Sequence, residues 1–113
     1  ESKVIFELNS GNNKEVDNLA KLISSKIEKE KTFSKIISTY NIEDEFIKNF
    51  ESMINRYTKS ETIKISSELI IDDSTNSVIT LIPIGVSRYS YLKKIKRFLE
   101  IQKINIEGII LVK

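Results

Sequence analysis

Residues 78–86 constrain the fold of this chain more than any other segment, because the run is apolar on both faces of an extended chain. A strand with water on one side alternates between polar and apolar residues, whereas a strand covered on both sides does not. We therefore expect a strand here that is covered on both sides. Pro83 cannot donate a ladder hydrogen bond, so it is expected at an edge position or at a bulge near the end of the strand.

Hydrophobic periodicity predicts the remaining elements. Further strands are expected at 3–8, 63–71 and 104–112, with a hairpin loop at 72–77 leading into the strand at 78–86. Helical spacing predicts helices at 13–31 and 87–101, the first capped by Asn12 or Asn13. Between residues 33 and 57 the pattern indicates one or two more helices with a break and fresh N-cap at Asn41, carried by the apolar residues Phe33, Ile36, Ile37, Tyr40, Phe46, Ile47, Phe50, Met53, Ile54 and Tyr57.

These elements predict one α+β domain over residues 1–113. The expected order is strand-helix-helix-strand-strand-helix-strand, with a small antiparallel-rich sheet and helices packed on one of its faces. A length of 113 residues and a hydrophobic content of 40% suit one domain with its own core. The residues expected to be buried together in that core are Phe46, Phe50, Ile54, Leu81, Ile95 and Leu99.

The chain contains no cysteine and no histidine. This excludes disulfides, thiolate chemistry and the most frequent general base and metal ligand. Motifs for a serine nucleophile elbow or a phosphate-binding glycine loop are also absent from the sequence. We therefore expect a protein that is not an enzyme and that holds no cofactor and no metal.

Two polar clusters have simpler explanations than a site. Asp72, Ser74 and Asn76 are spaced like the first ligands of a calcium loop, but Ser77 stands where that loop needs glycine and Pro83 where it needs glutamate. A polar turn is the expected structure. The acidic run 43–45 could be imagined as an acid/base pair, but consecutive residues at the start of a helix point apart, and the helix dipole already favours acids there.

The most basic segment lies between residues 88 and 103, where six basic residues against Glu100 alone give a net charge of +5. One interpretation is an electrostatic surface for phosphates or for an acidic partner, and the other is a solvated helix face. Phe98 is expected in the buried stripe with Tyr91 and Ile95, which favours the solvated face. The candidate partner-contact residues are Arg88, Lys93, Lys94, Lys96 and Arg97.

The segment from residue 78 to residue 111 combines a strand ending in Gly85 and a small polar residue, a helix carrying Tyr91, Leu92, Phe98 and Leu99, and a closing apolar strand. This half of the chain resembles the PilN/PilO-like domains of type IV pilus and type II secretion platforms, and also ring-building domains with the same element order. The resemblance implies a ferredoxin-like or ring-building-like fold. It also implies a dimerising scaffold set after a membrane helix.

The front of the chain resembles a second family. The segments 4–9 and 16–22 look like the first strand and helix of OmpA-like peptidoglycan-binding domains. Those domains bind diaminopimelate through an Asp and an Arg in characteristic motifs. Here residues 85–88 (Gly-Val-Ser-Arg) replace the first motif and the second is absent.

We therefore expect a non-enzymatic protein-interaction scaffold that forms a homodimer or pairs with a homologous domain. The alternatives are a peptidoglycan binder and a weak nucleic-acid binder that uses residues 88–103; nucleic acid is not the expected partner. The frequent use of Ile, Lys, Ser and Asn suggests an AT-rich bacterial genome. Because the chain begins at Glu1, we expect a processed protein or an excised piece, with any membrane anchor upstream and the bacterial cell envelope favoured over the cytoplasm.

Overall fold

The computed structural model describes residues 4–30, 34–39, 42–59, 62–69, 75–84 and 88–113. Five strands form one sheet in the order β1-β5-β4-β2-β3, and every neighbouring pair is parallel. The expected combination of helices with a sheet is confirmed, but the expected antiparallel-rich sheet is wrong. In chain order the elements are β1 (Val4–Leu8), α1 (Asn13–Glu30), β2 (Ser34–Ser38), α2 (Asp44–Tyr57), β3 (Ile65–Ser66), β4 (Ser77–Pro83), α3 (Arg88–Ile101) and β5 (Asn105–Val112).

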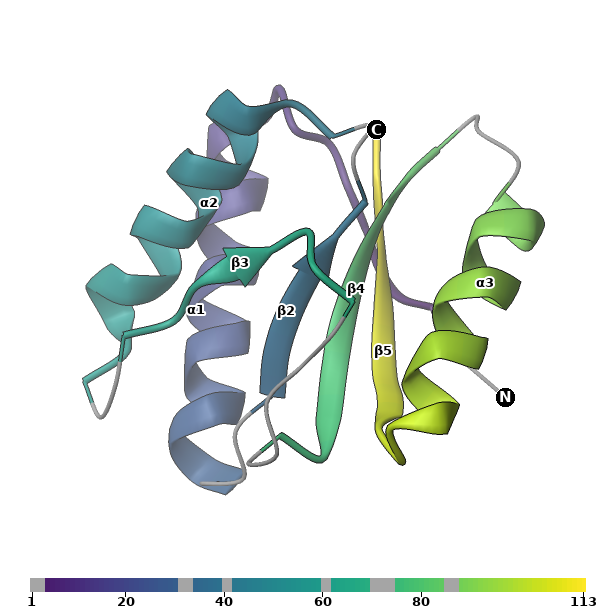
Figure 1. The fold of residues 1–113 in the computed structure, drawn as a ribbon. Coiled ribbons are helices and arrows are strands. Elements are labelled where there is room, and N and C mark those ends of the chain that lie inside the picture. Colours follow the sequence, from purple (N-terminus) through teal and green to yellow (C-terminus); the bar gives the residue numbers. More distant parts are fainter. Residues whose placement is uncertain (1–3, 31–33, 40–41, 60–61, 70–74, 85–87) are drawn as a thin grey trace.

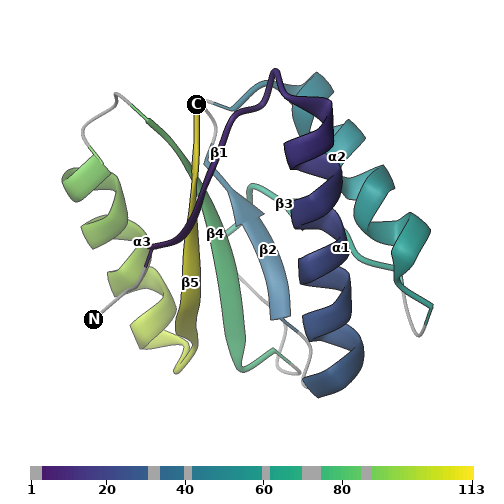
Figure 2. The same ribbon diagram turned by 180° about the vertical axis from the view of Figure 1, so that it is seen from behind.

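Helices cover both faces of the sheet, with α1 and α2 on one side and α3 on the other (Figures 1 and 2). Successive residues of one strand therefore enter different cores. In β4, Leu81 packs with residues of α1 and α2, whereas Ile82 packs on the side of α3 with Leu92. The expectation that residues 78–86 form a strand covered on both sides is confirmed for β4, and the expectation of helices on one face is wrong.

The second predicted helical stretch is partly a strand, β2. Ile36 and Ile37 are both fully buried, the first in the core under α1 and α2 and the second in the core under α3. A short apolar run fits a buried strand and a buried helix equally well, so periodicity could not separate the two. The order of elements is consequently strand-helix-strand-helix-strand-strand-helix-strand.

The predicted hairpin is also absent from the described residues. β3 and β4 are not neighbours, because β2 lies between them and pairs with both in parallel. The sheet therefore does not follow the ferredoxin-like or ring-building-like arrangement that the resemblance implied. Pro83 is the last residue of β4, an interior strand, so its missing N–H falls where the strand ends.

The six predicted core residues are all buried, but they are not buried together. Phe46, Phe50, Ile54 and Leu81 belong to the core under α1 and α2. Ile95 and Leu99 belong to the core under α3, on the other side of the sheet. The error has the same origin as the misplaced helices, since a sheet covered on both faces needs two cores.

The residues at the starts of α1 and α2 occupy capping and first-turn positions. The Asn12 side-chain oxygen accepts a hydrogen bond from the backbone N–H of Glu15 at 3.1 Å, as expected for the residue that caps α1. Asp44 and Glu45 lie in the first turn of α2, where the helix dipole favours acids. Glu43 occupies the N-cap position of α2, and Asn41, the predicted cap, lies outside the described residues.

Candidate functional site

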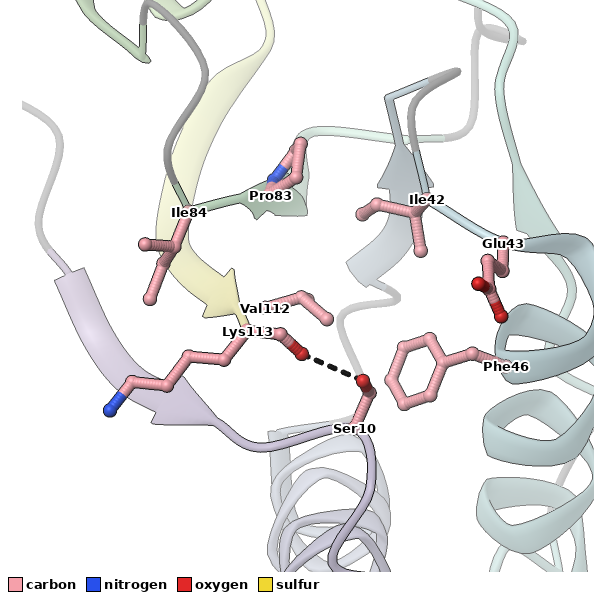
Figure 3. Close-up of a pocket in the computed structure, with 8 residues that line it drawn as sticks. All are labelled: Ser10, Ile42, Glu43, Phe46, Pro83, Ile84, Val112 and Lys113. Atoms are coloured by element: carbon pink, nitrogen blue, oxygen red, sulfur yellow. Dashed lines mark hydrogen bonds between the residues drawn. The ribbon is translucent and has the colours of Figure 1, made fainter.

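The C-terminal ends of the parallel strands lie together at one end of the sheet, where a hollow of about 240 Å³ opens (Figure 3). The chain leaves β2 towards α2 on one face and leaves the neighbouring β4 towards α3 on the other face. Ligands of open parallel sheets commonly bind at such a switch point. The described residues that line the hollow are Ser10, Ile42, Glu43, Phe46, Pro83, Ile84, Val112 and Lys113.

The described residues that line this hollow include no hydroxyl that is hydrogen-bonded to a side-chain base. The Ser10 hydroxyl donates to the backbone carbonyl of Lys113 at 2.7 Å, and a carbonyl cannot activate a nucleophile as a base would. The Lys113 ammonium extends away from the hollow and lies 3.8 Å from the Glu7 carboxylate (Figure 3). The Glu43 carboxylate stands near the Phe46 ring. Five of the eight described lining residues have apolar side chains, and Ser10, Glu43 and Lys113 add polar groups.

The described residues form neither a metal site nor a membrane-spanning helix. No group of three or more acidic, histidine or cysteine side chains in this part of the chain could hold a metal ion. Asp72 and Ser74, from the calcium-like spacing, lie outside it. No described helix is long and apolar enough to cross a bilayer.

Three of the five predicted partner-contact residues come together on α3. Lys93, Lys94 and Arg97 line a shallow depression of about 360 Å³ with Ser90. Lys93, Lys94 and Arg97 follow Ser90 by three, four and seven residues, which places all four on the outer side of one helix. Lys96 is half-buried and is not among the described lining residues, and the side chain of Arg88 lies outside the described part of the chain.

Phe98 is exposed, which corrects the expectation that it belongs to the buried stripe. The stripe of α3 that faces the sheet is formed by Leu92, Ile95 and Leu99. Phe98 stands beside this stripe with 44% of its surface exposed, and Ile101 follows on the outside with 78% exposed. A three-residue step covers about 300° of a helix turn, so a position three residues from Ile95 can fall on either side of the boundary.

β1 forms one edge of the sheet, and its outer side is not paired with any described strand. The carbonyl of Leu8 accepts from the N–H of Lys113 at 2.8 Å, and the N–H of Ser10 donates to the carbonyl of Lys113 at 3.3 Å. In a parallel sheet, the N–H and C=O of one residue point towards the neighbouring strand on one side, and those of the next residue point towards the other side. The backbone N–H and C=O of Glu7 therefore point away from β5. Val4 and Ile5, on the same strand, are 45% and 42% exposed.

The opposite edge, β3, is shorter and is held by side chains of α2. The Asn55 amide donates to the carbonyl of Ile63 at 2.8 Å and accepts from its N–H at 2.6 Å. The Glu51 carboxylate accepts from the N–H of Ile65 at 2.7 Å. These bonds satisfy backbone groups that would otherwise be available to another strand. The two edges of the sheet thus differ, and β1 is the open one.

The sequence predicted the basic residues of α3 and association through a sheet edge or a helix face, but not the hollow, the exposed position of Phe98 or which strand forms the open edge. The hollow and the open edge depend on strand order and direction, and the exposure of Phe98 depends on which stripe of α3 packs on the sheet; local patterns do not contain this information. No family model, no curated protein and no solved structure matches the chain.

Proposed function

We propose that this domain is a non-catalytic protein-interaction module that pairs, through the outer edge of β1, with a second copy or with a homologous domain. The observation that supports this most is the difference between the two sheet edges. β1 has five residues, directs the backbone of Glu7 outwards and exposes Val4 and Ile5. β3 has two residues, and α2 side chains bond the backbone around it.

An open edge strand provides affinity through its main chain. Each outward N–H and C=O can pair with a strand of another molecule, and exposed apolar side chains add buried area on assembly. Two copies related by a two-fold axis would place their β1 strands antiparallel, a closed arrangement that leaves no further edge at the interface. Such an interface needs no sequence motif, which fits a chain whose sequence contains none of the site motifs considered above.

The resemblance to pilus and secretion platforms suggests a bacterial envelope assembly as the setting. The parallel sheet differs from the ferredoxin-like fold that the resemblance implied, so the proposal of this setting rests on the sequence alone. Pairing through β1 is independent of the compartment.

Replacement of Glu7 by Pro tests the proposal. Proline removes an N–H that points outwards, so the bonds of β1 to β5 are retained while the edge loses a donor. Sedimentation over a wide concentration range should show a dimer for the wild-type protein and a monomer for Glu7→Pro. Glu7→Thr is the matched control, since it removes the same carboxylate but keeps the N–H, and it should still dimerise.

Two results would contradict pairing through β1. One is a wild-type protein that stays monomeric at millimolar concentration and binds no homologous domain. The other is a dimer that Glu7→Pro leaves unchanged while circular dichroism shows a native fold.

A further inference from the structure

We propose that the outer face of α3 docks on the surface of a bilayer containing anionic phospholipids. Lys93, Lys94 and Arg97 would bind the headgroup phosphates, and Phe98 and Ile101 would enter the interfacial region. This surface lies on a different element from the β1 edge, so either proposal can fail without the other.

The residues that line the depression on α3 are suited to binding an oxyanion. Two ammonium groups, one guanidinium and the Ser90 hydroxyl surround it, and no acidic side chain is among its described lining residues. Ammonium and guanidinium groups are donors only, so they suit the acceptor oxygens of a phosphate. The nearest acidic residue along the helix is Glu100, which is exposed one turn beyond Arg97. Within α3 the basic residues therefore outnumber the acidic ones, although the chain as a whole carries only +2.

The exposed apolar side chains favour a phospholipid as the source of that phosphate. Ile101 is 78% exposed and Phe98 is 44% exposed, and both lie in the last turns of the helix whose preceding turns carry the basic residues. Single-stranded nucleic acids bind by stacking on aromatic rings, a platform that Phe98 offers but that Ile101, the more exposed of the two, does not. A bilayer surface accepts both kinds of group, because phosphates lie beside an apolar phase.

The position of α3 permits this contact. Among the described helices, α3 lies on one side of the sheet, while α1 and α2 cover the other side (Figures 1 and 2). No other described helix covers its outer face, which can therefore approach a flat surface. Leu92, Ile95 and Leu99 remain in contact with the sheet, so docking does not require the helix to unfold or turn.

Vesicle co-sedimentation tests the proposal with the intact chain. Vesicles of phosphatidylcholine with 30 mol% phosphatidylglycerol, roughly the anionic content that gives a surface potential of tens of millivolts, are compared with pure phosphatidylcholine. The wild-type protein should bind the anionic vesicles and be released by 0.5 M salt, since salt at roughly this strength screens charges beyond a few ångströms. The double variant Lys94→Gln/Arg97→Gln should lower the partition coefficient roughly 30-fold.

Matched controls separate this surface from a general effect of charge. Lys14→Gln/Lys48→Gln removes two exposed charges from α1 and α2 and should bind like the wild type. Ile101→Ser keeps all charges and should weaken binding several-fold, because part of the apolar contact is lost. Inorganic phosphate at millimolar concentration should not displace the protein, since it lacks the apolar component.

Three outcomes would overturn the proposal. The first is equal binding to both kinds of vesicle. The second is equal loss in the α3 double variant and in its control. The third is nanomolar binding to fluorescent single-stranded DNA that Lys94→Gln/Arg97→Gln abolishes and Ile101→Ser leaves intact, which would make this face a nucleic-acid surface instead.

Discussion

The Tyr57 hydroxyl, in the last turn of α2, donates a 2.6 Å hydrogen bond to Oδ1 of Asp17 in α1. This hydrogen bond is the main reason that the pKa of Asp17 lies below its ordinary value of 3.8, with the nearby Lys21 ammonium adding to the effect. The same bond raises the pKa of Tyr57 above 10.0. The pair joins the two helices that cover one face of the sheet.

Replacement of Tyr57 by Phe should raise the pKa of Asp17 towards its ordinary value. A carboxyl group whose pKa is lowered in the folded state stabilises the fold above its unfolded pKa, and this contribution is lost as the pH falls through the folded value. The raised pKa of Tyr57 acts oppositely, so its contribution is lost as the pH rises through its folded value, above 10.0.

Carbon-detected NMR titration of the Asp17 carboxyl group in both proteins measures this effect directly. Urea unfolding at pH 7 and pH 3 should show a smaller acid-induced loss of stability in the variant than in the wild type. An Asp17 pKa that does not change in Tyr57→Phe would contradict the assignment of the hydrogen bond as its main cause.

The two cores should respond independently to mutation. Ile54 lies in the core under α1 and α2, and Ile95 lies in the core under α3. Each Ile→Val substitution should lower the free energy of unfolding by about 0.5–1.5 kcal/mol. Because the sheet separates the two residues, the double variant should equal the sum of the single variants within about 0.5 kcal/mol in urea unfolding. A coupling above about 1 kcal/mol would indicate that they share a core.

The turn after α3 contains a residue that glycine should improve. Lys103 has a φ of 61°, in the left-handed region. The N–H of Ile104 donates to the carbonyl of Leu99 at 2.9 Å, and the N–H of Lys103 donates to the carbonyl of Glu100 at 3.0 Å. This is the Schellman arrangement, in which glycine is the usual residue at the left-handed position.

Lys103→Gly should therefore raise the free energy of unfolding by up to about 1 kcal/mol, because the Cβ of an L-residue is disfavoured at this φ. Lys103→Ala is the control: it removes the same charge but keeps the Cβ, so thermal unfolding should show no comparable gain. Equal stability of the two variants would show that the backbone at this position is not strained.

Two buried threonines should respond in opposite directions to valine. Among the described residues, the Thr80 hydroxyl has no hydrogen-bond partner, although Thr80 is fully buried in β4. The Thr58 hydroxyl donates to the carbonyl of Ile54 at 2.9 Å and lies 2.8 Å from the Ser24 hydroxyl. Thr80→Val should raise stability by about 1 kcal/mol, and Thr58→Val should lower it by about 1 kcal/mol. A loss of stability in Thr80→Val would indicate that its hydroxyl is bonded in solution.

Sequence patterns predicted the long helices and strands, and also the short strand β1. The helices α1, α2 and α3 were found because apolar residues recur over several turns, as with Phe46, Phe50 and Ile54. β4 and β5 were found because they are long apolar runs. β2 was missed because five residues with two adjacent isoleucines carry no period that distinguishes a strand from a helix turn.

The candidate surfaces were likewise predictable from the sequence only where they depend on local geometry. Lys93, Lys94 and Arg97 could be placed on one helix face from their spacing, since that depends only on the geometry of a helix. The exposure of Phe98 depends on which stripe of α3 the sheet selects, and the open edge at Glu7 depends on which strand lies outermost.

The sequence by itself determined where most helices and strands lie, that the six predicted core residues are buried and that a net charge of +5 gathers around α3. These properties follow from the periodicity and composition of single segments, so they can be inferred without knowing how the segments pack. Only the tertiary structure decided that the strands are parallel, that β2 separates β3 from β4 and that the core is divided in two. A strand presents hydrogen-bonding groups along both edges whatever its neighbour, so the choice of neighbour is made by the packing of the whole chain.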